Sequence, residues 1–239
     1  EFFNRKPVTL REDFCGTFAV CCEWAKLGPE RRAVGVDLDD EPLQWGRKHN
    51  LAKLNAEQQQ QIELVQDDVR QIGDQPADIL AAQNFSFWIF RTRQQLREYF
   101  EAARNNLADD GLMVLDMMGG YECLEENHED IRKIKWPGKD HNGKSRGSFT
   151  YVWEQHRFDP ITHDATFYIH FRFKDDSKLP RAFAYHWRFW SLPEVRELLE
   201  EAGFSESHVY WEGTDEDGEG DGEWQRENSA ASDPSWIAY

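Results

Sequence analysis

Apolar residues in the first 116 positions form short runs separated by segments with helical spacing. Five runs predict strands, at residues 8–10, 33–36, 62–65, 78–82 and 112–116. Helices are predicted after the first run as far as residue 27, over 41–54, and before residue 110, where apolar residues recur at 96, 99, 100, 103 and 107. Strands that alternate with helices through short connections form a parallel sheet with helices on both faces. We therefore expect a doubly wound α/β fold.

The pattern changes after residue 148, where apolar and polar residues alternate with a period of two. The alternation covers residues 166–173 and 182–189, and a strand is also expected over 151–158. One face of these strands is aromatic, which is typical of an antiparallel sheet packed on one side. Residues 149–190 are therefore predicted to form an antiparallel β-meander inserted into the α/β core.

The core is expected to resume at residue 191. Ser191 and Glu194 form a capping box with proline in the first turn, and Gly203 ends the predicted helix. Two closing strands are predicted at 207–212 and 235–239, with a solvated acidic loop at 212–227 between them. The predicted organisation is a core over 1–148, the inserted meander over 149–190 and the rest of the core over 191–239.

Charge and composition narrow the class of partner. The chain has 28 Lys and Arg residues against 45 Asp and Glu, a net charge of −17, which argues against a large nucleic-acid surface. No apolar run approaches the ~20 residues that a membrane span needs. The four cysteines show no paired metal or disulfide spacing, and the histidines lie at spacings that do not suit a metal, so a reduced, cytoplasmic protein without a metal site is expected.

Candidate ligand-binding residues follow the predicted parallel strands, because ligands of doubly wound sheets bind at the carboxyl ends of the strands. The first four strands are followed in turn by 12–18, by Asp37 and Leu38, by Asp68 and Val69, and by Asn84 and Phe85. A carboxylate after the second strand suits the two adjacent hydroxyl groups of a ribose, and Gly16 lets the backbone approach a ligand. Neither G-x-G-x-x-G nor a P-loop is present, so the site suits an adenosine without phosphates.

These segments resemble the motifs of class I S-adenosylmethionine-dependent methyltransferases. Glu12-x-x-Cys15-Gly16-Thr17 resembles their first, glycine-rich motif, and Gly35-Val-Asp37 resembles their ribose-binding motif. The stretches 67–69, 107–116 and 201–204 are similar to their adenine-binding motif, their helix-to-fifth-strand segment and their final helix-to-strand turn. The resemblance covers about residues 8–116 and 191–239. It implies a seven-stranded sheet whose last strand is antiparallel, and methyl transfer from S-adenosylmethionine.

The resemblance also implies roles for individual residues. Glu12 would orient the glycine loop, Gly16 would lie under the cofactor, and Asp37 would bind the ribose. Asp68 and Val69 would contact the adenine, and Asn84 would lie near the methyl group. The full set implied for cofactor binding is Glu12, Cys15, Gly16, Thr17, Asp37, Leu38, Asp68, Val69, Asn84 and Phe85.

Two phenylalanines depart from the family pattern, since Phe14 and Phe18 stand where the first motif usually has its outer glycines. A side chain at either position prevents the backbone from approaching the cofactor closely, so the loop is expected to be reshaped. Whether this weakens or abolishes cofactor binding is left open by the sequence. Two alternatives follow. The chain is a non-catalytic binding protein of the same fold, or it is an NAD(P)-dependent oxidoreductase, which the missing pyrophosphate loop disfavours.

The methyl acceptor is expected to be a small molecule with an N or O nucleophile, because an aromatic insertion favours an enclosed pocket with the meander as its wall or lid. Trp88 is expected to border the methyl group, and the face of the meander that carries His170, His186 and Arg188 is the candidate acceptor surface. Pairing of Arg188 with a carboxylate is the structural alternative. No catalytic base is assigned. A homodimer through the exposed edges of the meander is a further hypothesis.

Overall fold

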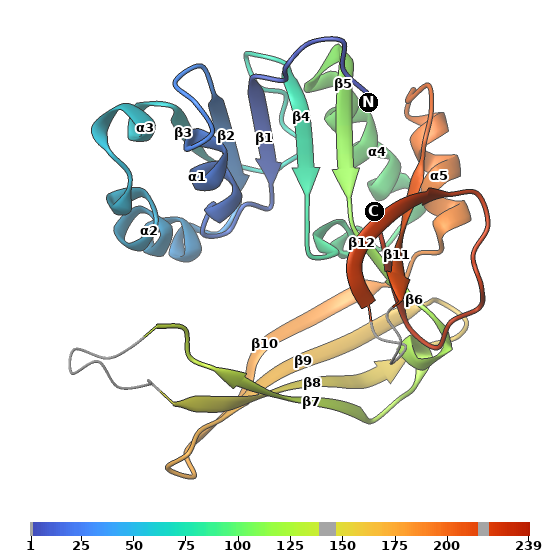
Figure 1. Cartoon of the computed structure of the whole chain (residues 1–239). Helices are drawn as coiled ribbons and strands as arrows, with labels where there is room; N and C mark the ends of the chain where they lie inside the picture. Colours follow the sequence, from blue (N-terminus) through green and yellow to red (C-terminus); the bar gives the residue numbers. More distant parts are fainter. Residues whose placement is uncertain (1, 139–146, 215–219) are drawn as a thin grey trace.

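A computed structural model describes residues 2–138, 147–214 and 220–239 of the chain (Figure 1). Its core is a five-stranded parallel sheet in the order β3-β2-β1-β4-β5. The strands are β1 (Thr9–Asp13), β2 (Arg32–Asp37), β3 (Ile62–Gln66), β4 (Ala77–Ala82) and β5 (Leu107–Leu115). The predicted doubly wound parallel sheet is therefore confirmed.

Helices cover both faces of this sheet because alternate strand residues point to opposite sides. On one face, buried residues of α1 and α2 pack with Leu10, Ala33 and Ala81. On the other, α4 packs with Leu80 and Ala82. The helices are α1 (Ala19–Ala25), α2 (Asp40–His49), η1 (Leu51–Lys53), α3 (Ala56–Gln60), η2 (Ser86–Ile89), α4 (Arg93–Asn105), η3 (Tyr121–Leu124) and α5 (Leu192–Glu201).

Several predicted boundaries in this core were wrong. The first strand, expected over 8–10, continues to Asp13, and the helix expected to end at residue 110 ends at Asn105. The helix expected over 41–54 ends at His49 and is followed by the short η1. The fifth strand begins at Leu107 rather than 112, because an irregularity in its pairing with β4 accommodates the polar residues 108–111. The capping box at Ser191 is confirmed as the start of α5.

A second sheet continues from the end of β5, in the order β12-β11-β13-β6. Its strands are β6 (Met117–Gly119), β11 (Val209–Thr214), β12 (Gly220–Glu227) and β13 (Trp236–Ala238). The last strand, β13, pairs antiparallel with β6, as expected for the final strand. A single seven-stranded sheet is not confirmed, since Asp116 separates β5 from β6. The prediction of an acidic loop at 212–227 was wrong for the residues that the structure describes. Residues 212–214 form the end of β11 and residues 220–227 form β12, while 215–219 lie outside the described residues.

The third sheet is antiparallel, in the order β10-β9-β8-β7, and lies beyond the carboxyl ends of the parallel strands (Figure 1). Its strands are β7 (His128–Lys135), β8 (Ser148–Phe158), β9 (Asp164–Arg172) and β10 (Lys178–Arg188). The three predicted strands are confirmed. The predicted start at residue 149 misses β7, because this edge strand carries two apolar residues among eight and shows no clear alternation.

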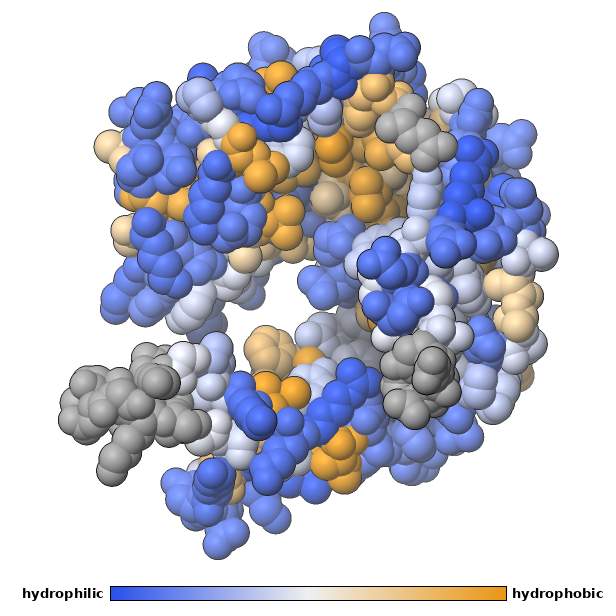
Figure 2. All heavy atoms as spheres, viewed as in Figure 1, coloured by the Kyte–Doolittle hydropathy of each residue, from blue (hydrophilic) through white to orange (hydrophobic). Residues whose placement is uncertain are grey.

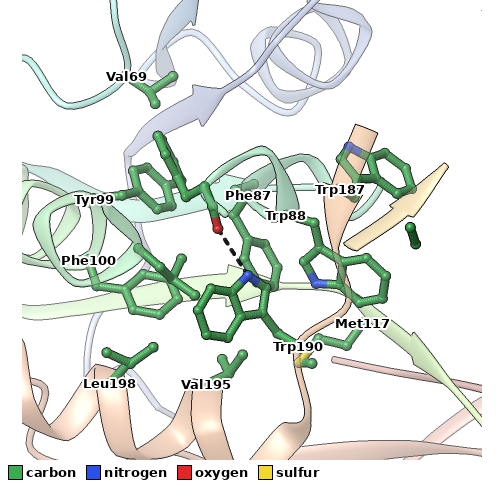
Figure 3. Close-up of a cluster of buried hydrophobic side chains, with 14 of the residues drawn as sticks. Val69, Phe87, Trp88, Tyr99, Phe100, Met117, Trp187, Trp190, Val195 and Leu198 are labelled. Atoms are coloured by element: carbon green, nitrogen blue, oxygen red, sulfur yellow. Dashed lines mark hydrogen bonds between the residues drawn. The ribbon is translucent and has the colours of Figure 1, made fainter. Parts of the chain in front are cut away.

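Aromatic side chains join the third sheet to the core (Figure 3). Trp187 of β10 contacts Phe85 and Trp88 edge to face, with ring centroids 6.4 and 5.8 Å apart. The indole N–H of Trp190 donates to the Phe90 carbonyl at 3.1 Å. Aromatic pairs of this kind add to the stabilisation that apolar burial provides. The third sheet is therefore packed against the parallel core and not merely connected to it by the chain. No helix in the described part of the chain is long and apolar enough to cross a membrane.

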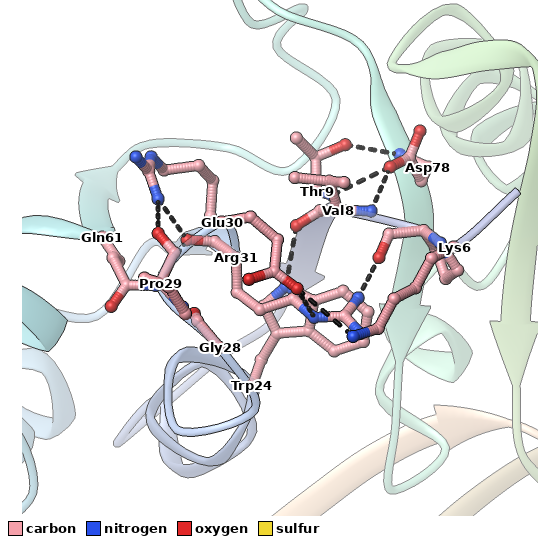
Figure 4. Close-up of polar contacts among 12 residues, drawn as sticks. Lys6, Val8, Thr9, Trp24, Gly28, Pro29, Glu30, Arg31, Gln61 and Asp78 are labelled. Atoms are coloured by element: carbon pink, nitrogen blue, oxygen red, sulfur yellow. Dashed lines mark hydrogen bonds and ion pairs between the residues drawn. The ribbon is translucent and has the colours of Figure 1, made fainter.

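A polar network joins β1 to β4 at the amino ends of these strands (Figure 4). Both Val8 and Thr9 donate backbone N–H groups to Asp78 Oδ2, at 2.5 and 2.9 Å. The Arg5 guanidinium donates to Asp78 Oδ1 at 2.5 Å. Burial opposes ionisation of Asp78, but the hydrogen bonds from Arg5, Thr9 and Val8 outweigh it and lower the pKa of this carboxyl. The ionised Asp78 therefore stabilises the start of β1.

Replacing Asp78 with asparagine is expected to lower the free energy of unfolding by about 1–3 kcal/mol at pH 7, since hydrogen bonds to a buried charge are lost. Because the folded-state pKa is lowered, this contribution is full above about pH 4 and is lost as the pH falls below it. Urea unfolding at pH 7 and pH 3 measures both effects. Asp74→Asn, at an exposed position, is the matched control, and an equal loss at both pH values would contradict the assignment.

Candidate active site

The candidate site lies where the strand order reverses, between β1 and β4. Both strands point their carboxyl ends toward the third sheet (Figure 1). Neighbouring loops leave such a sheet in opposite directions at this point, which opens a crevice for a ligand. Of the ten residues predicted to bind a cofactor, Glu12 and Asp37 lie at the carboxyl ends of β1 and β2 and the other eight in the loops after β1, β2, β3 and β4. The fold brings them to one edge of the sheet.

Glu12 organises the loop after β1. Its side chain is buried, and Oε2 accepts the backbone N–H of Cys21 at 2.8 Å. That N–H belongs to the first turn of α1, whose N-cap residue makes no side-chain hydrogen bond, so Glu12 satisfies a donor that the helix cannot pair itself. Burial raises the pKa of Glu12. Glu12 therefore ties the end of β1 to the first turn of α1.

Gly16 and Asp37 are joined directly. The Gly16 N–H donates to Asp37 Oδ2 at 2.7 Å, and the Asp39 N–H donates to Asp37 Oδ1 at 2.9 Å. Gly16 has a φ of 52°, and a Cβ placed on it would meet no atom within 4 Å. Leu38, 70% exposed, follows directly. Gly16 therefore faces open space on the side of its missing side chain, and its N–H lies against the Asp37 carboxylate.

Phe14 and Phe18, at the positions of the outer glycines, direct their rings into the core. Their φ angles are 55° and 46°, so the backbone takes the left-handed conformation that glycine would take. The Phe18 ring is fully buried beside Gly46, and the Phe14 ring packs against Phe90 and Tyr99. Because both rings enter the core, neither covers Gly16. The sequence shows the loss of glycine but not the direction of the rings.

Cys15 and Thr17 have structural contacts in this loop. Burial raises the pKa of the Cys15 thiol well above its usual range, so the side chain stays protonated and packs as an apolar group. The backbone carbonyl of Thr17 accepts the Asn50 side-chain N–H at 2.9 Å. Both residues flank Gly16, as the motif predicts.

Asp68 and Val69 lie in the loop after β3. Asp68 pairs with Arg70 at 2.7 Å, and hydrogen bonding to that guanidinium lowers the pKa of Asp68. The Val69 side chain is buried. Asp68 therefore stays ionised. Any ligand amine that bound its carboxylate would share it with Arg70.

Arg11, which sequence reasoning missed, holds this loop in place. It is a buried residue of β1 that donates to the Val69 carbonyl at 2.9 Å and to Asn106 Oδ1 at 3.0 Å. Its Nε pairs with Asp13 Oδ1 at 2.7 Å, and Asp13 also accepts the Tyr99 hydroxyl at 3.1 Å. The available signal was three consecutive charged residues, 11–13, directly after the predicted first strand, where β1 in fact continues buried to Asp13.

Asp116 holds the loop after β4, a second role that sequence reasoning missed. Its carboxylate accepts the backbone N–H groups of Asn84 and Phe85 at 2.8 and 2.9 Å. Both donors have left-handed φ angles, 60° and 57°. Burial raises the pKa of Asp116. Strained backbone held by a buried group is typical of functional sites.

A cavity of about 510 Å³ lies next to this loop. Phe85 and Met118 border it from the core, Tyr151 and Trp153 from the third sheet, and Trp236 from β13. Figure 2 shows the wide hollow between the core and the third sheet. A larger cavity, about 840 Å³, is bordered by α5, β11 and residues 226–231 and includes none of the predicted site residues.

The residues predicted to contact the acceptor do not border the 510 Å³ cavity next to Phe85. Trp88 is fully buried in the aromatic core. His170 and His186 lie on the face opposite to Trp153 and Tyr185, where His170 Nε2 meets Glu154 Oε2 at 2.7 Å. Arg188 pairs with Glu194 at 3.1 Å, the structural alternative. The aromatic face is turned toward the core, as the sequence predicts, and it is this face that borders the cavity.

Residues 2–138, 147–214 and 220–239 contain no group of three His, Cys, Asp or Glu side chains arranged to hold a metal ion.

The left-handed conformation at Phe18 predicts an inverted order of stability between two truncations. Both Phe18→Gly and Phe18→Ala lose about 3–5 kcal/mol of core packing. Alanine additionally carries about 1–2 kcal/mol of backbone strain at positive φ, so the glycine variant should unfold at higher urea concentration. Phe90, with a φ of −78°, is the control position, where glycine should be the less stable. The same order at both positions would contradict the assigned conformation; Phe14 offers a half-buried repeat of the comparison.

Known structures share this fold, although no protein-family model matches the chain and no curated protein matches its sequence. The CcbJ methyltransferase from Streptomyces caelestis aligns with a TM-score of 0.66 and 13% identity, over 96% of this chain and 81% of that one. An S-adenosylmethionine-dependent methyltransferase from Clostridium acetobutylicum aligns at 0.61 and 15%, over 98% and 85%. Cofactor-bound CalS10, an amino pentose methyltransferase from Micromonospora echinaspora, aligns at 0.65 and 16%, over 98% and 83%. The chain therefore has the fold of the class I S-adenosylmethionine-dependent methyltransferases.

Proposed function

We propose that the protein binds S-adenosylmethionine and transfers its methyl group to an N or O atom of a small molecule. The observation that carries the proposal is the open space above Gly16, next to Asp37 and the exposed Leu38, at the point where the strand order reverses. Fold alone does not specify an activity. A carboxylate, an exposed leucine and a glycine at these strand ends support a site for an adenosine.

Each loop supplies a part of the cofactor site in this proposal. Asp37 has one acceptor position left on each oxygen for the ribose hydroxyl groups, since each already accepts one backbone N–H. Leu38 covers the adenine ring, and Asp68 accepts its amine. Glu12 and Asp116 hold the loops around the methionine portion.

Bound S-adenosylmethionine supplies an electrophilic methyl group on a positively charged sulfur. The protein's own residues then have three tasks: to align the acceptor, to exclude water and to tolerate the charge. Phe85 borders both the strained loop and the cavity, so its ring can face the sulfonium. Alignment accounts for up to about 7–11 kcal/mol of catalysis in favourable cases. A base is required only for acceptors that must lose a proton.

The acceptor site in this proposal is the cavity bordered by Tyr151 and Trp153, with the third sheet as its wall. CalS10, named as an amino pentose methyltransferase, favours a small acceptor. The inward-facing rings of Phe14 and Phe18 weaken the non-catalytic alternative, since they leave Gly16 uncovered. We further propose that β5 and β6 act as one interrupted strand of a seven-stranded sheet, and that the protein is cytoplasmic.

Calorimetric titration with S-adenosylhomocysteine tests the cofactor site. We expect micromolar binding by the unmodified chain. Asp37→Ala removes an acceptor for both the ligand and Gly16, so the affinity should fall at least tenfold, the equivalent of one hydrogen bond to a charged group. Asp40→Ala, three positions away and exposed, should bind as the unmodified chain does. Absence of binding by a folded chain would contradict the proposal.

A homodimer through the third sheet is the second proposal, because β7 and β10 are edge strands with exposed pairing groups. Light scattering over a hundredfold range of concentration should show a mass near twice 28.2 kDa at the upper end. A mass near 28 kDa throughout would rule it out.

A further inference from the structure

The inner face of the third sheet carries more apolar surface than its contact with the core uses. Trp153 and Phe167 lie on this face and pack into the core cluster. The register of the strands places five more apolar residues on the same face, farther from the core. We name these five the aromatic track: Ile134, Phe149, Tyr151, Phe171 and Phe183.

The rings of the track contact one another and form a continuous surface. Phe171 lies 6.1 Å from Tyr151, 5.7 Å from Phe149 and 6.4 Å from Phe183, measured between ring centroids. Such spacings are those of interacting aromatic pairs. Trp136 extends the surface beyond Phe149, at 4.6 Å. The track is therefore a platform rather than a set of isolated side chains.

The outer end of the track is exposed to solvent. Phe183 is 52% exposed, its neighbour Leu179 51% and Ile134 37%. The hollow between core and third sheet lies above this face, and apolar side chains border it (Figure 2). Contiguous apolar exposure of this kind marks a binding surface.

The track is continuous with the cavity next to Phe85. Tyr151 belongs to both, and Trp153, which borders the cavity, is two residues farther along β8. From Trp153 to Phe149 the strand spans about 13 Å, at roughly 3.3 Å per residue. One ligand can therefore fill the cavity with one end and lie on the track with the other.

Polar groups are concentrated on the other face or at the cavity end. Glu154, His170 and Arg172 lie on the opposite face of the sheet. On the inner face, Asp130 and Arg132 pair with each other at 2.5 Å beside the cavity. Polarity on the inner face is thus concentrated at the cavity end, where Tyr151 has Arg132 as its cross-strand neighbour, while Ile134, Phe149, Phe171 and Phe183 carry no polar side-chain group.

We propose that the aromatic track binds the apolar body of the methyl acceptor, an elongated amphipathic molecule whose nucleophilic amine or hydroxyl group lies in the cavity at Phe85. The inference rests on the proposed methyl transfer at this site. Continuity with the cavity favours the acceptor over a separate partner. The track then selects acceptors by the length of their apolar part.

Calorimetric titration with primary n-alkylamines of four, six and eight carbons tests the inference, using the full chain saturated with S-adenosylhomocysteine. Affinity should rise about fourfold for each methylene group that the track buries. In Phe183→Ser the eight-carbon amine should lose about tenfold in affinity, while the four-carbon amine, too short to reach Phe183, should be unchanged. Ile161→Ser removes an equally apolar side chain that is 92% exposed on the turn before β9, and should change neither.

Other outcomes overturn the inference. Affinity independent of chain length, or an equal length dependence in Phe183→Ser, would show that the track does not bind the acceptor. A dimer that Phe183→Ser dissociates, without any length dependence in the monomer, would assign the surface to a second copy of the chain. Failure of S-adenosylhomocysteine to bind would instead count against the proposed function. The amine series on the cofactor-free chain would still test the track.

Discussion

Two buried carboxylates hold backbone N–H groups at the ends of β1 and β4, and the geometry of the site depends on them. Glu12 holds the first turn of α1, and Asp116 holds Asn84 and Phe85 in left-handed conformations. Left-handed backbone costs of order 1–3 kcal/mol per residue outside glycine, and burial of each carboxylate adds a desolvation cost. Their hydrogen bonds offset these costs only in the folded arrangement, so the strained backbone and the hydrogen bonds that stabilise it form together on folding.

Much of the fold could be predicted because its elements are locally encoded. Strands of the parallel sheet are apolar runs, and the helices carry caps such as Ser191 with Glu194. β7 escaped prediction because an exposed edge strand needs no apolar face. The acidic residues 220–227 also suggested a loop, yet they pair with β11. In both strands the backbone partner, rather than the side chains, determines the conformation, and a single sequence does not show that partner.

The sequence could predict those parts of the candidate site that directly follow a predicted strand. Gly16 and Asp37 lie together as the motif implies. The roles of Arg11 and Asp116 depend on contacts across 58 and 32 residues, which spacing does not reveal. The prediction also placed the acceptor on the histidine face of the meander. Alternation correctly identifies the aromatic face as the one that packs on the core, through contacts such as those of Trp187. It does not show that a cavity also borders this same face.

The third sheet combines two tasks on one face. Near the core, Phe167 and Trp187 are buried and fix the sheet. Farther out, the same strands leave Phe183 exposed over the hollow. Because a strand is stiff, anchoring at one end sets the position of the other, so the distance from the strained loop to the track is determined by core packing rather than by a flexible lid. Substitutions on the track should therefore change acceptor preference with little effect on the loops that hold the cofactor, since no residue of the track belongs to those loops.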